Sequence, residues 1–143
     1  MMAEFNPNHV MHGNGGMAWW NGKKLTTLQS VEAKATGDFE DVNVCNDAST
    51  YRIYNGYSGE GTLVWLKIDS DVLAELAEAF QTGVMPEITI ITAHAQKGTN
   101  KVERIAYYGV TVDEIMLAKF EKKAKTEQEV PFKFARFEVL ETI

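Results

Sequence analysis

Apolar and polar residues alternate along much of the chain with a period of two, the spacing of a β-strand that separates two environments. The pattern is clearest between 62 and 68, where Val64 and Leu66 lie on one face and Leu63 and Trp65 on the other. Apolar residues on both faces predict a strand that is partly buried on both sides. The same period predicts further strands over 87–94, 102–112 and 130–139, and a strand, a turn at Gly37–Asp38 and a second strand over 31–45.

One segment has the period of a helix instead. Its apolar residues recur every three or four positions and form a single stripe: Val72, Leu73, Leu76 and Phe80. Asp69 or Ser70 can supply the oxygen that caps the first turn, and Gly83 offers the left-handed stop. We predict one helix over about 70–82, with Phe80 among the residues that anchor it in the core.

Turn signals divide the N-terminal part of the chain. Asn21-Gly22 separates two strand-like runs and predicts a tight hairpin, because both residues accept a positive φ. Residues 1–15 are rich in Asn, Gly and Pro and predict a flexible arm, followed by a single domain over 16–143.

Residues 46–61 combine three tyrosines with Gly, Asn and Ser and show no apolar period, so we predict a long exposed hairpin or loop. Tyrosine and tryptophan are enriched at protein interfaces, because their rings are apolar and their edges polar. Filling the core is the alternative for each ring, and for the two tryptophans it is equally favoured. The candidate interface residues are Trp19, Trp20, Tyr51, Tyr54 and Tyr57.

The C-terminal strand carries Phe132 and Phe134 on one face, which we predict to be the buried face that anchors it in the core. Pro131 cannot donate a ladder hydrogen bond and belongs at a strand start or edge. The apolar phase slips near Ala135–Arg136, which indicates a β-bulge or a change of sheet.

Residues 111–128 support two interpretations. Thr111 and Glu114 match a helix capping box, and Met116, Phe120 and Ala124 lie four residues apart. A strand would instead explain the alternation of Ile115 and Leu117 with polar neighbours. The local pattern alone favours the helix.

Charge and composition exclude several classes of protein. The 143 residues carry 14 basic and 20 acidic side chains, a net charge of −6, so tight binding to nucleic acid is disfavoured. The one lysine-rich run, 119–125, is interleaved with Glu121 and reads as a solvated face of mixed charge. No apolar run reaches the ~18 residues of a membrane span, and the N-terminus lacks a secretory pattern. A single cysteine, Cys45, excludes an internal disulfide and is consistent with a reducing cytoplasm.

No motif predicts catalysis, a cofactor or a metal. His9 and His12 could approach one ion, but they lack a third ligand and are better explained as incidental. The glycines of 59–61 lack the serine of a nucleophile elbow and the lysine of a phosphate loop. An enzyme therefore has no support in the sequence.

The order of these segments resembles a known family. The matching pieces are Gly59-Glu-Gly-Thr-Leu-Val-Trp-Leu-Lys67, the single helix, 104–115 (RIAYYGVTVDEI) and the ending Glu129-Val-Pro-Phe-Lys-Phe. Over residues 13–143 the chain is similar to the core tail tube proteins of contractile-tailed phages and PBSX-type defective prophages. The longer arm before Gly13 departs from that pattern.

The resemblance implies a mostly β fold, a sandwich or barrel-like domain with one flanking helix, in which 114–121 is a strand. It further implies that six copies form a ring and that rings stack into a hollow tube, the conduit for DNA. Sheath subunits, a tape-measure protein and baseplate or initiator proteins would be the partners, in a tail assembled in the bacterial cytoplasm. Six copies at −6 each give −36 per ring, which would repel DNA phosphates rather than bind them.

Two other functions stay open. A headless tailocin or type VI-like injection device would use an almost identical subunit. A carbohydrate-binding β-sandwich would use Trp19, Trp20 and the tyrosines as a sugar platform, and would be a monomer with glycan affinity.

Overall fold

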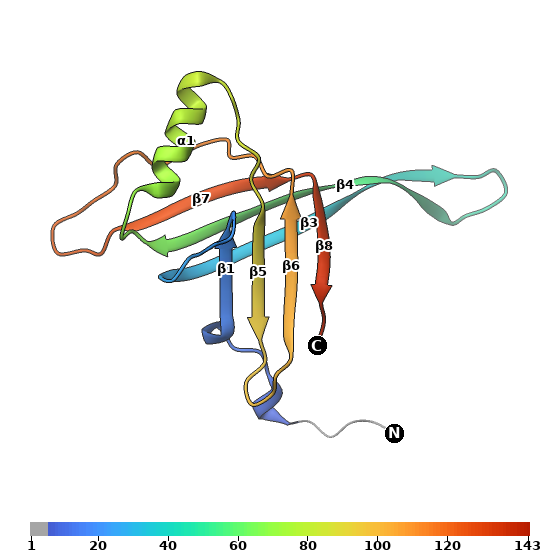
Figure 1. Ribbon diagram of the computed structural model, residues 1–143. Coiled ribbons are helices and arrows are strands. Elements are labelled where there is room, and N and C mark those ends of the chain that lie inside the picture. The colour runs from blue at the N-terminus through green and yellow to red at the C-terminus, as the bar shows by residue number, and fades with distance from the viewer. Residues whose placement is uncertain (1–5) are drawn as a thin grey trace.

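The computed structural model describes residues 6–143, which form two antiparallel β-sheets and one α-helix (Figure 1). The five-stranded sheet has the order β2-β1-β5-β6-β8, made by Lys23–Lys24, Gly16–Trp20, Ile90–Ala95, Val102–Tyr108 and Arg136–Glu141. The three-stranded sheet has the order β3-β4-β7, made by Leu28–Asn43, Thr50–Leu66 and Glu127–Phe134. The helix α1 spans Asp71–Thr82. The predicted mostly β fold with one flanking helix is confirmed.

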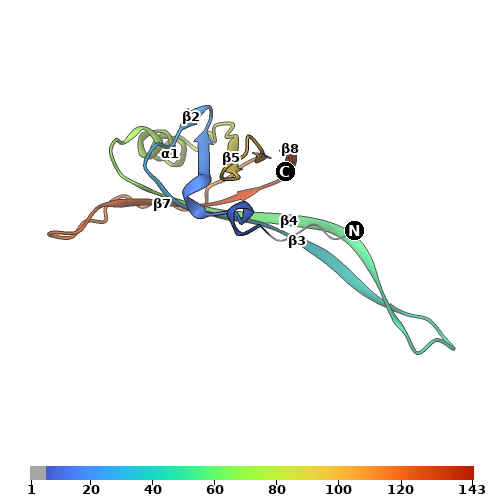
Figure 2. The same ribbon diagram turned by 90° about the horizontal axis from the view of Figure 1, so that it is seen from below.

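β3 and β4 form a long hairpin whose outer half projects far beyond the rest of the molecule (Figures 1 and 2). Residues 46–61, predicted as an exposed hairpin or loop, are its tip and most of its second strand. The predicted turn at Gly37–Asp38 is wrong, because β3 runs straight through it. The register shifts between Asp38 and Phe39 because the partner strand β4 carries one extra residue there, Asn55. The ring of Phe39 lies over Gly37, at the position where a Cβ atom would sit, so this glycine is a packing position within a strand and not a turn residue.

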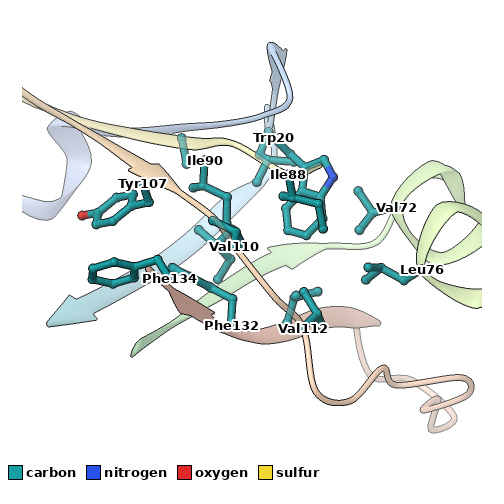
Figure 3. Close-up of a cluster of buried hydrophobic side chains, with 14 of the residues drawn as sticks. Trp20, Val72, Leu76, Ile88, Ile90, Tyr107, Val110, Val112, Phe132 and Phe134 are labelled. Atoms are coloured by element: carbon teal, nitrogen blue, oxygen red, sulfur yellow. The ribbon is translucent and has the colours of Figure 1, made fainter. Parts of the chain in front are cut away.

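The hydrophobic core lies between the two sheets (Figure 3). Ile90 and Tyr107 reach it from the five-stranded sheet, and Phe132 and Phe134 from β7. Phe132 and Phe134 are 2% and 6% exposed, and the ring of Phe134 lies 4.9 Å from that of Tyr107. The C-terminal segment is thus held in the core by its aromatic face.

Gly59 and Gly61, in the second half of β4, pack against the two phenylalanines of the Phe-x-Phe segment in β7. They lie opposite Phe134 and Phe132 across β4 and β7. The two rings cover the positions where a Cβ atom would sit on each glycine. The Gly-x-Gly and Phe-x-Phe segments are therefore the two sides of one packing contact.

Gly59→Ala is expected to lower the free energy of unfolding by about 1–3 kcal/mol, the usual effect of overpacking a core. The added methyl would overlap the Phe134 ring, which Tyr107 prevents from moving aside. Urea denaturation of the monomer measures the loss. Gly13→Ala is the control, because nothing lies within 4 Å of its Cβ position. Equal stability of the two variants would contradict this packing.

The helix α1 begins and ends where the sequence predicts. Asp69 accepts a hydrogen bond from the backbone N–H of Asp71 through Oδ1 (3.2 Å), while the Ser70 side chain makes no capping bond. Gly83 ends the helix with φ 77°. At 12 residues α1 is too short to cross a membrane, and the described part of the chain holds no other α-helix.

Phe80 is not a core residue, contrary to the prediction, and its side chain is 39% exposed. The buried stripe of α1 runs through Val72, Leu76 and Ala79. Phe80 follows Ala79 and is rotated from it by about 100° around the helix axis, so its ring points past the core.

The chain changes from one sheet to the other at Ala135. This is one of the two explanations predicted from the slip in the apolar pattern near Ala135–Arg136. β7 ends at Phe134 in the three-stranded sheet, and β8 begins at Arg136 in the other. The Ala135 backbone N–H donates to the carbonyl of Tyr108 (3.0 Å) and fixes the crossing.

Residues 113–126 form neither the helix nor the strand that the sequence allowed. They are loop and turn, fixed at the start by a bridge of Thr111 to Lys133 and by the buried Val112. The four-residue spacing of Met116 and Phe120 builds no helix, because neither side chain has a core to pack against: they are 39% and 84% exposed.

Candidate assembly surfaces

The projecting part of the hairpin, residues 36–58, is termed the hairpin arm, and each of its two faces carries exposed apolar side chains. On one face the rings of Phe39 and Tyr54 lie 5.4 Å apart, and the Arg52 guanidinium sits 4.4 Å above Phe39. The same guanidinium approaches Asp41 at 3.8 Å. The pairing of Phe39 with Tyr54 and of Asp41 with Arg52 in the strand register puts all four on one side.

The other face of the hairpin arm carries Val42 and Glu40 opposite Tyr51 and Ile53. Tyr51, Ile53 and Tyr54 are each more than half exposed. A two-stranded ribbon has no core beneath it, so these apolar side chains stay largely exposed in a single copy, which is typical of a contact surface.

The tip of the arm is fixed by one acidic residue. Tyr51 donates its hydroxyl to Asp47 Oδ2 (2.5 Å), and the backbone N–H of Ser49 donates to Asp47 Oδ1 (2.9 Å). The bond from Tyr51, and then that from Ser49, hold the pKa of the Asp47 carboxyl below its usual value. The same bond to Asp47 raises the pKa of the Tyr51 hydroxyl.

Tyr51→Phe is expected to return the pKa of Asp47 toward its ordinary value. Because that pKa is lower in the folded chain, the bond stabilises the tip above the carboxyl's unfolded pKa. Its contribution is lost as the pH falls through the lowered value. Carboxyl carbon shifts in an NMR titration of the monomer measure this. Tyr54→Phe serves as control, and an unchanged Asp47 titration in Tyr51→Phe would contradict the bond.

Two long edge strands, β3 and β8, lack a partner on one side within residues 6–143. β3 pairs with β4 on one side and with none of the described strands on the other. β8 is an edge strand of the second sheet, with every residue exposed and with Phe137, Val139 and Leu140 each more than 40% exposed. Unpaired edges are templates for pairing with another chain.

The outer face of the three-stranded sheet is polar. Within residues 6–143 no other strand and no α-helix covers it (Figure 2). By strand alternation, the side chains of every second residue project from it. Lys34 pairs with Glu60 at 3.2 Å, and Lys133 with Asp113 at 3.3 Å. Where all three strands lie side by side, up to Ala35 on β3, the charged strand residues of this face are four carboxylates and two lysines: Glu32, Glu60, Glu127, Glu129, Lys34 and Lys133.

The two tryptophans do not join the tyrosines. Trp20 is only 2% exposed, and its Nε1–H donates to Glu75 Oε2 (3.3 Å) beneath α1, so its assignment to an interface is wrong. Trp19 is half-buried with the Arg104 guanidinium 5.6 Å from its ring. Because side chains alternate along β1, Trp20 points into the core and Trp19 points to the opposite face of the sheet.

Tyr51 and Tyr54 lie near the tip of the arm, on opposite faces, whereas Tyr57 lies at its base, where its ring meets Phe137 at 5.5 Å. The five candidate interface residues are therefore spread over three places. Sequence reasoning missed Phe39, Phe137 and Phe120, which are also exposed.

The N-terminal segment before β1, residues 6–15, lies against the end of β5 in the five-stranded sheet. Residues 6–15 form two 3-10 turns, Pro7–His9 and Gly13–Gly15, and Gln96 Nε2 donates to the His9 carbonyl (3.0 Å). Residues 1–5 of the predicted flexible arm lie outside the described residues. In residues 6–143 no three His, Cys, Asp or Glu side chains gather as a metal would need.

A comparison with models of protein families identifies the family of the chain that carries these surfaces. Residues 3–141 match the model described as phage tail tube protein. The chain belongs to the phage tail tube protein family. It is accordingly a structural protein of phage-type tails and not an enzyme.

Individual similarities agree with the family. The PBSX phage-like element protein XkdM of Bacillus subtilis strain 168 is 23% identical over 94% of this chain and 93% of its own length. Among solved structures, the tube-terminating cap of the anti-feeding prophage has a TM-score of 0.77 at 9% identity, covering 99% of this tube protein and 96% of the cap chain.

Two further structures share the fold. A chain of the sheath–tube complex of PVC, an extracellular contractile injection system, has a TM-score of 0.75 at 9% identity over 94% of the tube protein and 93% of its own length. A chain of an empty gene transfer agent tail with C6 symmetry has a TM-score of 0.55 at 11% identity, over 91% and 98%.

Proposed function

We propose that six copies of this tail tube protein close into a ring and that rings stack into the hollow inner tube of a contractile phage-type tail. DNA passes through the bore without specific binding. The observation that carries this is the open β3 edge, 16 residues long, in a chain of the phage tail tube family. A subunit with such an edge is protected from uncontrolled pairing when the edge is closed by its neighbours.

The two edge strands of the three-stranded sheet support ring closure. β3 is one edge, and β7 is the other, bridged only where Thr111 meets Lys133. Joining β3 of one copy to the β7 side of the next makes a continuous barrel wall. The six-fold count is supported by the C6 symmetry of the gene transfer agent tail, whose chain shares this fold.

The outer face of that sheet suits the bore. Four carboxylates against two lysines leave −2 per copy on its strands, or −12 in six copies. A negative wall repels DNA phosphates and keeps them moving. The opposite face carries the core and the second sheet, so it faces outward, where sheath subunits would surround the tube.

Sheath association is supported by the shared fold with a chain of the PVC sheath–tube complex. Tape-measure and baseplate or initiator proteins complete the expected partners, in a tail assembled in the host cytoplasm. The folds of the anti-feeding prophage cap and the PVC chain favour a headless injection device as the second candidate. Micrographs of native particles with or without DNA-filled heads separate the two.

Electron microscopy of the purified protein, concentrated stepwise, tests the proposal. We expect six-fold rings and then hollow tubes. A protein that stays monomeric at every concentration and binds glycans would favour the carbohydrate-binding alternative instead.

A further inference from the structure

The end of the three-stranded sheet opposite the hairpin arm carries a second projecting segment, residues 116–126, here termed the basic loop (Figure 1). The backbone N–H of Lys67, just after β4, donates to the Thr126 carbonyl (2.9 Å) and holds the loop beside that end. Figure 2 shows the arm and the loop extending in opposite directions along the sheet.

The basic loop combines an exposed aromatic ring and an exposed aliphatic chain with a net charge of +3, from four lysines and Glu121. Leu117 is 68% exposed and Phe120 84%. Lys119, Lys122 and Lys123 form no ion pair within residues 6–143, whereas Lys125 approaches Glu127 at 3.5 Å. Solvation alone explains the lysines but not two large apolar side chains left in water beside them.

One face of the hairpin arm has the complementary character. Glu40 lies opposite Ile53 in the strand register, and Val42 opposite Tyr51, so an acid and three apolar side chains share this face. Asp38 is two residues before Glu40 on the same strand and therefore on the same side. Neither Asp38 nor Glu40 makes an ion pair in the described part of the chain.

These two surfaces cannot meet within one copy. From Ile53 on the arm face to Leu66, where β4 ends beside the loop, the extended strand runs 13 residues, which is roughly 40 Å. The complement of each surface is consequently on another copy. Contacts between opposite ends of a subunit are head-to-tail and can repeat along an axis.

We propose that the acidic, apolar face of the hairpin arm docks on the basic loop of a second copy in the adjacent ring. This inference rests on the proposed function, since it assigns the contact that joins one ring to the next. Copies with a net charge of −6 repel each other at long range, and the basic loop supplies the local attraction that sets where the arm lands. Phe120 and Leu117 then lose water against Ile53 and Tyr51.

A charge exchange tests the pairing. K119E/K122E is expected to form rings but to need about tenfold more protein to form tubes, because two attractive contacts become repulsive. D38K/E40K is expected to fail in the same way. The four-residue variant that combines both pairs restores opposite charges and the parent's net charge, and it should form tubes again. Sedimentation and electron microscopy measure tube formation.

K97E/K101E is the matched control, because it makes the same change in net charge at two exposed lysines of the β5–β6 turn. Melting temperatures of all variants should equal that of the parent, since every substituted side chain is exposed. Salt is a poorer probe, because it also screens the general repulsion between acidic copies.

Tubes from K119E/K122E at the parent's concentration would overturn this inference alone. So would a control that fails equally, a combined variant without recovery, or loss of the rings themselves, which would place the contact within a ring. A parent protein that forms no tubes at any concentration would overturn the proposed function and this inference with it.

Discussion

Phe134→Ala is expected to lower the free energy of unfolding by about 3–5 kcal/mol, the range for removing a large aromatic side chain from a packed core. The Phe134 ring contacts Tyr107 at 4.9 Å and meets Phe137 edge-on at 6.2 Å. It also covers Gly59, so its removal leaves a cavity that the flat glycine surface cannot fill.

Denaturation of the monomer, below the concentration at which rings form, measures this loss, because assembly would add stability by mass action. Phe120→Ala is the control, since a side chain that is 84% exposed should change stability by no more than about 0.5 kcal/mol. A Phe134→Ala protein that unfolds like Phe120→Ala would mean that the C-terminal strand is peripheral to the core.

Local rules of backbone chemistry predicted the features that depend on neighbouring residues. Asn21 and Gly22 form the tight turn with φ of 47° and 85°. Asp69 and Gly83 bound the helix. The slip in apolar phase at Ala135 marked the change of sheet, because a strand that leaves one sheet for another must present a different set of residues to the core.

The failures depend on contacts in space that the local pattern of residues does not report. Gly37 resembles a turn residue until the ring of Phe39 is seen to occupy its Cβ position. Phe80 belongs to a plausible apolar stripe, but the sheets meet only the part of α1 that passes through Leu76 and Ala79. The apolar period shows which face of its helix or strand a side chain lies on. It does not show how far along that face another element packs.

The candidate surfaces were predicted in part. The polar surroundings of Tyr51 and Tyr54 indicated exposure correctly, because few apolar neighbours were available to bury them. Neither the local pattern nor the family resemblance predicted the basic loop. The local pattern favoured a helix, and the resemblance implied a strand over 114–121. In one copy Phe120 has nothing to bury against, so a pattern that requires a partner gives no regular structure in the subunit alone.

Removing residues 39–55 is expected to abolish tubes while leaving the subunit folded. The register places Gly37 opposite Tyr57 and Asp38 opposite Gly56. The deletion joins Asp38 directly to Gly56 and keeps that register with a two-residue Asp-Gly loop, the preferred sequence of a type I′ hairpin turn. None of the removed side chains is buried, so the core between the sheets stays complete.

Stacking of rings should fail in this variant because the deletion removes the exposed Phe39, Tyr51, Ile53 and Tyr54, and with them the apolar area that a second copy can cover. Circular dichroism and thermal melting report on the fold, and electron microscopy reports on rings and tubes. A Tyr54→Phe protein is the matched control, since it keeps the ring and loses only the hydroxyl. An unfolded deletion variant would show that the hairpin arm supports the subunit, and tubes of normal length would show that rings stack through other surfaces. Folded subunits that reach rings and stop there are the expected outcome, because the open β3 edge and the β7 side remain intact from Leu28 to Asp38.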